Sequence, residues 1–270
     1  MLIEECNFTK TLDVKQMTIN NNDDLKKIAA MLSKATSAVA FTGAGISTES
    51  GIPDFRSPGG VWAKNRTIYF DEFLRSPEAR YEYWQQKSEA HRDFSNAKPN
   101  LAHQTLANWE STNRLRGVIT QNIDGLHQIA GSQNVLELHG TAREIMCLQC
   151  EKRYGADEMV QQFLAEDAVP ECPNCGGRMK HATISFGQPL LPAVIQESSA
   201  WSRNADVYFA MGSSLVVEPA ASLPRLAKEH GASLIIINRD PTPLDSIADI
   251  VVNAAIGETM ESLNEFLETL

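Results

Sequence analysis

The sequence predicts an α/β protein built around a doubly wound parallel sheet. Short apolar segments have the composition of buried strands, and segments with helical periodicity separate or follow them. Strands that alternate with helices favour a parallel sheet with right-handed crossovers. Two spaced cysteine pairs interrupt this alternation and predict a smaller metal-binding module. The predicted strands are 38–41, 116–120, 134–138, 206–211, 233–237 and 250–252.

Helices are predicted around these strands. Asn22 or Asp23 can cap a helix that continues to about Ser33, because short polar side chains accept hydrogen bonds from a helix's first turn. The segment from about 70 to 96 mixes polar residues with aromatics and predicts helices whose aromatic side chains lie mostly in the core. Other helices are expected at about 101–110, 219–230 and 257–269.

The chain is predicted to form one Rossmann-type domain with two insertions. That dinucleotide-binding domain is expected to comprise residues 21–66, 97–142 and 182–270, after an N-terminal extension of residues 1–20. The helical segment 67–96 and the cysteine-bearing segment 143–181 are expected to form a small domain above it. The sequence shows no internal repeat and no low-complexity segment.

Composition limits the possible partners. The 270 residues carry a formal net charge of -10, which argues against sequence-independent nucleic-acid binding and is compatible with basic protein substrates. No apolar run approaches the length needed to span a bilayer. The N-terminus lacks the basic start of a signal peptide, so a reducing cytoplasm is expected. Oligomeric state is left open, and Cys6 lies outside every motif.

The first predicted strand leads into a glycine loop, Thr-Gly-Ala-Gly-Ile-Ser, at residues 42–47. Gly43 and Gly45 allow a sharp turn and a close approach to a ligand, with backbone N–H groups free for phosphate oxygens. A third glycine is missing, since Ser47 stands near its place. No acidic residue follows about twenty positions on, where Asn65 and Arg66 are found and a dehydrogenase binds the ribose.

The same loop continues with Asp54, Phe55 and Arg56. An acid, an aromatic and a cation beside a pyrophosphate site indicate that the dinucleotide is cleaved there. A tight turn without a ligand is the alternative for the glycine pair alone.

Polar residues also follow the next two predicted strands. Gln121, Asn122 and Asp124 come after 117–119, and His139 comes after 135–138. Side chains at the carboxyl ends of parallel strands point into the crevice where such sheets bind ligands. A histidine titrates near neutrality, so His139 can accept a proton from a hydroxyl. Taken singly, these residues could also serve only in a turn or as structural hydrogen bonders.

Four cysteines have the spacing of a zinc site. Two Cys-x-x-Cys pairs are separated by twenty-one residues and lie beside turn-forming residues. Four thiolates complete a tetrahedral Zn²⁺ shell, which indicates a structural metal. Two disulfides are the alternative, but a reducing compartment disfavours them. Acidic residues between the pairs argue against a nucleic-acid-binding ribbon. The predicted ligands are Cys147, Cys150, Cys172 and Cys175.

Taken together, these motifs resemble those of the sirtuins, NAD-dependent protein-lysine deacylases. Gly-Ala-Gly-Ile-Ser, Gly-Ile-Pro-Asp-Phe-Arg, Thr-Gln-Asn-Ile-Asp-Gly-Leu-His, Leu-His-Gly, both cysteine pairs, Phe-Gly at 186–187 and Gly-Ser-Ser-Leu at 212–215 stand in the family's order. The match runs from about residue 25 to the C-terminus. The resemblance implies a two-lobed enzyme in which NAD and an acylated-lysine protein substrate meet in the cleft.

The resemblance also implies roles for individual residues. His139 is the implied base, with Asn122 and Asp124 forming the nicotinamide pocket. Phe55 would belong to a mobile loop, from which its side chain would shield the reactive ribose carbon of NAD. Ile184, Phe186, Gly187 and Val217 would hold an extended substrate between two strands. The implied NAD-binding residues are Gly43, Ala44, Gly45, Ser47, Asp54, Phe55, Arg56, Gln121, Asn122, Ile123, Asp124, Gly212, Ser213, Ser214, Asn238, Arg239 and Ile256.

The implied reaction displaces nicotinamide from the ribose with the acyl-amide oxygen. His139 then deprotonates the ribose hydroxyls, and water releases free lysine and 2'-O-acyl-ADP-ribose. Two alternatives use the same NAD site: a mono-ADP-ribosyltransferase, in which a protein side chain captures the ribose, and an NAD-sensing protein without turnover. A dehydrogenase is disfavoured because its ribose carboxylate is missing.

Acyl preference is expected to differ from that of sirtuins selective for succinyl-lysine, which carry a Tyr-x-x-Arg pair on the small-domain helix. Alignment puts Trp84 and Lys87 at this pair. Lysine lacks the bidentate fork of arginine, and an indole at the pocket would favour an apolar chain. Gln188 stands where many sirtuins have glutamate, which removes one negative charge beside the substrate-holding segment and is expected to weaken any preference for basic flanking residues. The expectation is that acetyl-lysine or a longer neutral acyl-lysine is preferred over succinyl-lysine.

Overall fold

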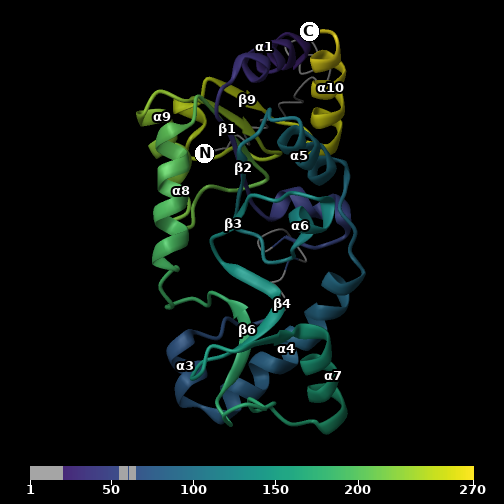
Figure 1. Ribbon diagram of the computed structural model, residues 1–270, viewed down its shortest axis with the longest axis vertical. Helices are drawn as coiled ribbons and strands as arrows, with labels where there is room; N and C mark the ends of the chain where they lie inside the picture. The colour runs from purple at the N-terminus through teal and green to yellow at the C-terminus, as the bar shows by residue number, and fades with distance from the viewer. Residues whose placement is uncertain (1–20, 55–59, 61–64) are drawn as a thin grey trace, which may run out of the picture.

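The computed structural model describes residues 21–54, 60 and 65–270, and its largest element is a six-stranded parallel sheet (Figure 1). The strand order is β3-β2-β1-β7-β8-β9, and every pair is parallel. This arrangement confirms the predicted fold class and all six predicted strands. The strands are β1 Ala38–Thr42, β2 Gly117–Thr120, β3 Val135–Glu137, β7 Val207–Met211, β8 Ser233–Ile237 and β9 Ile250–Val252.

Helices cover both faces of this sheet, which explains why its strands are apolar throughout. Side chains alternate between the faces along a strand, so Ala38 and Ala40 of β1 face one apolar cluster while Val39 and Phe41 face another. The first cluster includes residues of α1 (Asn21–Lys34), α5 (Leu101–Ser111) and α10 (Ile256–Glu268). The second includes residues of α8 (Pro192–Asn204) and α9 (Ser222–Glu229).

A second, smaller unit lies at the opposite end of the long axis (Figure 1). Its antiparallel sheet has the order β5-β4-β6, with β4 Gly140–Cys147, β5 Arg153–Gly155 and β6 Met179–Thr183. Helices α3 (Phe70–Arg75), α4 (Pro77–Asn96) and α7 (Ala156–Glu166) share a third apolar cluster with it. The two insertions predicted from the sequence therefore pack together, while the proposed domain boundaries stay a prediction.

Two of the described helices, α4 and α5, begin at residues whose side chains cap them. The Ser76 hydroxyl accepts a hydrogen bond from the Ala79 N–H at 3.0 Å, and Pro77 occupies the first turn of α4. Asn100 caps α5 in the same way by accepting from the Ala102 N–H at 3.0 Å. Elements that the sequence did not predict are the strands β4, β5 and β6, the helices α6 Leu126–Ala130, α7 and α8, and the 3₁₀ turns η1 Ala44–Ser50 and η2 Asp245–Ile247.

Several sequence predictions lie outside the described residues, namely those for the N-terminal extension, Cys6, Phe55 and Arg56. Within the part of the chain that the structure describes, none of the helices has both the length and the apolar character needed to cross a bilayer.

Candidate active site and zinc centre

A cavity of about 1270 Å³ opens at the carboxyl edge of the parallel sheet and extends to the small unit. This is where open α/β sheets bind ligands. Residues from the loops after β1, β2, β7 and β8 meet there with residues from α4 and from the segment after β6. Of the residues predicted for the site, those that line it are Gly43, Ala44, Gly45, Asp54, Gln121, Asn122, Ile123, His139, Ile184, Phe186, Gly187, Gly212, Ser213, Ser214, Val217, Asn238, Arg239 and Ile256.

The glycine loop after β1 packs against the loop after β7. A Cβ on Gly45 would lie 2.7 Å from the Cα of Gly212, and one on Gly212 would lie 2.4 Å from the Ile46 nitrogen. Only glycine permits this backbone approach, and Gly212 also has φ +62°. The Gly43 and Gly45 N–H groups donate to the carbonyls of Met211 and Gly212. The expectation that these two N–H groups are free for phosphate oxygens is therefore wrong.

Ser47 and Asp124 lie behind the cavity and do not line it. The Ser47 hydroxyl donates to the Asp124 carboxylate at 2.7 Å and accepts from the Asn122 amide at 3.1 Å. The Asn122 amide also donates to the Gly43 carbonyl at 3.1 Å. Asn122 faces the cavity, so this buried network fixes the direction in which its amide group points.

Two buried histidines, His103 and His127, lie beside this network. The His103 Nδ1–H donates to the Asn100 side-chain oxygen at 2.9 Å, and His127 Nε2 contacts the Thr42 hydroxyl at 2.9 Å. Burial lowers the pKa of His103 to about 4, partly opposed by the charge of Asp124. Burial, followed by repulsion from His103, also lowers the pKa of His127. Both imidazoles are therefore neutral at neutral pH.

These two imidazoles predict acid sensitivity. An unfolded histidine takes up a proton near pH 6.5, whereas folded His103 does so only near pH 4. Between these values the unfolded state binds more protons, so the free energy of unfolding falls as the pH drops, by up to about 1.4 kcal/mol per pH unit and histidine. Urea unfolding at pH 7.5 and 5.5, with zinc content measured in each sample, tests this. His103→Gln should weaken the dependence, and an equally steep loss of stability in that variant would contradict the assignment.

His139 occupies the turn between β3 and β4 and is held as a single tautomer. Its Nδ1 lies 2.9 Å from the carbonyl oxygen of Gln121, which can only accept, so Nδ1 carries the proton and Nε2 is left with a lone pair. Burial lowers the pKa of His139, and the bond to Gln121 opposes this. Among the residues that the structure describes, no hydrogen bond to Nε2 is found, and a neutral imidazole that lines the cavity is competent to accept a proton.

The chain beyond His139 links the two units of the molecule. Gly140 has φ +70°, and a Cβ there would lie 2.0 Å from the Ala182 carbonyl oxygen of β6. The His139 carbonyl accepts from the Ile184 N–H at 2.8 Å. The segment predicted to hold substrate is thereby fixed beside His139, and Phe186 is 44% exposed at the cavity.

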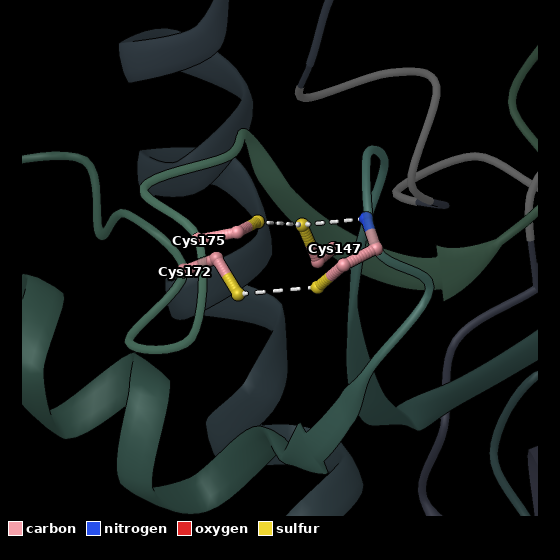
Figure 2. Close-up of side chains that lie close together, drawn as sticks. Cys147, Cys172 and Cys175 are labelled. Atoms are coloured by element: carbon pink, nitrogen blue, oxygen red, sulfur yellow. Dashed lines mark hydrogen bonds between the residues drawn. The ribbon is translucent and has the colours of Figure 1, made fainter.

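The four predicted metal ligands converge from two turns. Cys147 is the last residue of β4 and Cys150 follows it, while Cys172 and Cys175 precede β6. All four Sγ atoms lie within 4.8 Å of one another, with 3.5 Å between Cys147 and Cys175 and 3.7 Å between Cys150 and Cys172. Figure 2 shows the labelled sulfurs facing one another. A disulfide requires about 2.05 Å, whereas four thiolates about 2.3 Å from a zinc ion stand about 3.8 Å apart.

The surroundings of the sulfurs also suit thiolates. Backbone N–H groups of Gln149 and Cys150 point at Cys147 Sγ from 3.4 and 3.5 Å. A Cβ on Gly177 would lie 2.8 Å from the same sulfur, so the turn needs glycine there. The cluster fits a structural zinc ion and does not fit two disulfides.

One sequence expectation about the cavity is wrong. Trp84 does not reach it, because the indole is fully buried in the small unit's core and donates to the Met179 carbonyl at 3.1 Å. The α4 residues that do line the cavity are Tyr83, Gln86, Lys87 and Ala90. Their i, i+3, i+4, i+7 spacing marks one helix face, and this spacing was the signal in the sequence that could have identified Tyr83 and Gln86.

The fold and the site together define a nucleotide-binding α/β protein with a zinc module beside its ligand cleft. The sequence model of the Sir2 family matches residues 43–219. An NAD-dependent protein deacetylase of Thermodesulfovibrio yellowstonii is 42% identical over 94% of this chain and 99% of its own length. NAD-dependent protein deacetylase 1 of Bradyrhizobium diazoefficiens is 46% identical over 87% and 93%.

A solved structure described as Sir2 with a p53 peptide and NAD+ has a TM-score of 0.84 and 36% identity over 91% of this chain and 99% of that one. The chain belongs to the Sir2 family. The resemblance predicted from the sequence motifs is confirmed.

Proposed function

We infer that this protein is an NAD-dependent protein-lysine deacylase and that acetyl-lysine is among its substrates. The observation that carries this conclusion is His139, an imidazole fixed through Nδ1 that lines a cavity formed jointly by the glycine loop and the segment after β6. The named relatives and the solved complex with NAD and peptide support the same activity. The products are free lysine, nicotinamide and 2'-O-acyl-ADP-ribose.

We propose roles for the site residues from their positions. The loops carrying Gly43–Gly45 and Gly212–Ser214 would bind the phosphates and the adenosine half of NAD. Asn122, oriented by Ser47 and Asp124, would contact nicotinamide. Ser47 and Asp124 thus act as positioning residues. His139 would take a proton from a ribose hydroxyl so that this oxygen can attack the activated acyl group.

We propose that the substrate is an extended segment of an acylated-lysine protein. Ile184, Phe186 and Val217 line the cavity from two different loops, which suits a peptide backbone paired on both sides. The acidic surface suits basic sequence around the lysine and gives no support to direct nucleic-acid binding. Four zinc-binding thiolates suit a reducing, cytoplasmic location.

The test is product analysis. The protein is incubated with NAD and a peptide containing one acetyl-lysine, and the products are identified by mass. Expected are deacetylated peptide, nicotinamide and acetyl-ADP-ribose in equal amounts. ADP-ribose attached to the peptide or to the enzyme would instead identify an ADP-ribosyltransferase, and unchanged NAD would identify a binding protein.

A further inference from the structure

Lys87 brings a primary amine into the cavity that also contains His139. The residue is partly buried on α4 and lines the cavity beside Tyr83. Among the described residues, its Nζ has neither a hydrogen bond nor an ion pair, and it lies 5.8 Å from the centre of the Tyr83 ring. The amine is therefore accessible to a molecule that enters the cavity.

A second amine, on strand β6, makes a positive charge on Lys87 costly. Lys180 is 1% exposed, and its Nζ lies 5.5 Å from the centre of the same Tyr83 ring. It donates to the carbonyls of His181 and Thr183, which are neutral acceptors. Burial lowers the pKa of Lys87, and burial followed by repulsion from Lys87 lowers the pKa of Lys180 to about 7. Two amines that share one ring in this way favour loss of a proton.

Nearby carboxylates on the neighbouring helices are engaged elsewhere. Glu82 of α4 is bound by Arg66, with 2.6 Å between nitrogen and oxygen. Asp157 of α7 lies 2.7 Å from the ring nitrogen of His91. Neither acid is paired with Lys87, so its charge is not compensated by them. A lysine that is desolvated and next to another cation is the kind of lysine that acts as a nucleophile.

The reaction proposed above generates an acyl donor in the same cavity. Its product carries the acyl group as an ester of a ribose hydroxyl, and His139, the proposed base for forming that ester, lines the cavity with Lys87. A neutral amine converts an ester into an amide. An ester held in the cavity is presented to the amine at an effective concentration far above that of an ester in solution.

We propose that Lys87 is an acyl-acceptor site, which takes the acyl group from the acyl-ADP-ribose product before the ester leaves the cavity, so that the enzyme acylates itself. The site rests on the deacylase reaction proposed above. The Lys87 nitrogen attacks the ester carbonyl, a C–N bond forms, the C–O bond to the ribose breaks, and the proton of the amine goes to the departing ribose oxygen. The products are ADP-ribose and an amide on Lys87.

The experiment follows a heavy-isotope acetyl group. The wild type is incubated with NAD and a peptide whose acetyl-lysine carries the label, and each lysine of the digested enzyme is then examined by mass spectrometry. We expect the label on Lys87 to exceed that on exposed Lys34 by at least about tenfold, because only Lys87 meets the bound ester. Lys180, which is not among the residues that line the cavity, should stay unlabelled. Without NAD no ester forms, and Lys87 should stay unlabelled too.

Two further reactions identify the donor. Purified labelled acetyl-ADP-ribose, supplied without NAD or peptide, should label Lys87 in the wild type and also in the His139→Ala variant, because this reaction needs no turnover. A labelled acetyl thioester, supplied in the same way, reports acylation directly from solution and should not favour Lys87 over Lys34.

Variants show whether the label depends on this amine. Lys87→Arg keeps the cation and removes the nucleophile, and Lys87→Met also removes the charge. In both variants the total label per chain should fall to the background of exposed lysines. Lys34→Met removes an exposed lysine at the end of α1 and should leave the label on Lys87 unchanged.

The outcomes separate the acceptor site from the deacylase function. Label spread over exposed lysines without excess on Lys87, excess on Lys87 in the peptide reaction without NAD, or failure of supplied ester to label Lys87 would each overturn the site. Deacetylated peptide and nicotinamide, measured in the same samples, report the function separately. If both form while Lys87 stays unlabelled, the function stands and the acceptor site fails. If neither forms, the function fails, and the supplied ester still decides on the acceptor site.

Discussion

Replacing His139 with alanine is expected to lower kcat for deacetylation by about 100-fold or more, the usual scale for losing a positioned proton acceptor. NAD and peptide affinity should change little, because the imidazole is held by the backbone of Gln121 and anchors neither cofactor loop. Steady-state kinetics with one acetyl-lysine peptide, together with binding titrations, measure both quantities.

The matched control for this variant is His230→Ala. His230 is exposed at the end of α9, contacts the Leu226 carbonyl and is not among the residues that line the cavity. It should keep wild-type kcat. Near wild-type deacetylation by the His139→Ala variant would remove His139 from the role of base.

The pH profile gives an independent test of the same residue. A base must be neutral to accept a proton, and burial lowers the pKa of His139 below its ordinary value near 6.5. The deacylation rate should therefore stay high as the pH falls to that value and should decline only at lower pH. Single-turnover measurements between pH 5 and 8 locate the decline, and a midpoint above 6.5 would show that His139 is not the group that titrates.

Replacing Cys172 with alanine is expected to remove the zinc ion and to destabilise the small unit by several kcal/mol, because structural zinc contributes folding free energy directly. Cys172 is buried beside the core formed by α3, α4 and α7. Loss of the ion leaves thiols where the fold requires a cross-link between two turns. Elemental analysis should give one zinc per wild-type chain and almost none in the variant, with a lower unfolding temperature.

Cys6→Ala is the control for this experiment, since Cys6 belongs to neither spaced pair. It should retain zinc and stability. Purified wild type that contains no zinc, or whose cysteines resist alkylation because they form disulfides, would defeat the zinc assignment. Since α4 also carries Tyr83 and Lys87, we expect zinc loss to lower activity as well.

Most of the sheet could be predicted because its strands are buried on both faces. Such strands are short continuous apolar runs, and all six stand out from the polar segments around them. The cysteine ligands could be predicted for a similar reason, since the chemistry of a four-thiolate site restricts both residue type and spacing. Helix α7 was missed because it lies within the segment assigned to the zinc module, and α8 lies in a segment for which no element was predicted.

The sequence by itself determined the fold class, the family and the cysteines that cluster in the small unit, because each is encoded in local runs or short motifs. Only the tertiary structure decided what those residues touch. The Gly43 and Gly45 N–H groups are used by neighbouring carbonyls, and Ser47 lies behind the cavity bonded to Asp124. Contacts between loops far apart in the chain make these bonds, so local sequence cannot show them.

The clearest case is α4, where alignment puts Trp84 and Lys87 at the positions of the Tyr-x-x-Arg pair of succinyl-selective sirtuins. The helix is polar on most sides, so its sequence does not show which face is covered. Packing against β6 and α7 buries Trp84, and that choice turns Tyr83 and Lys87 toward the cavity. Rotation about a helix axis is set by the partner surface. The sequence therefore named the helix that borders the cavity, while the tertiary structure selected the side chains that line it.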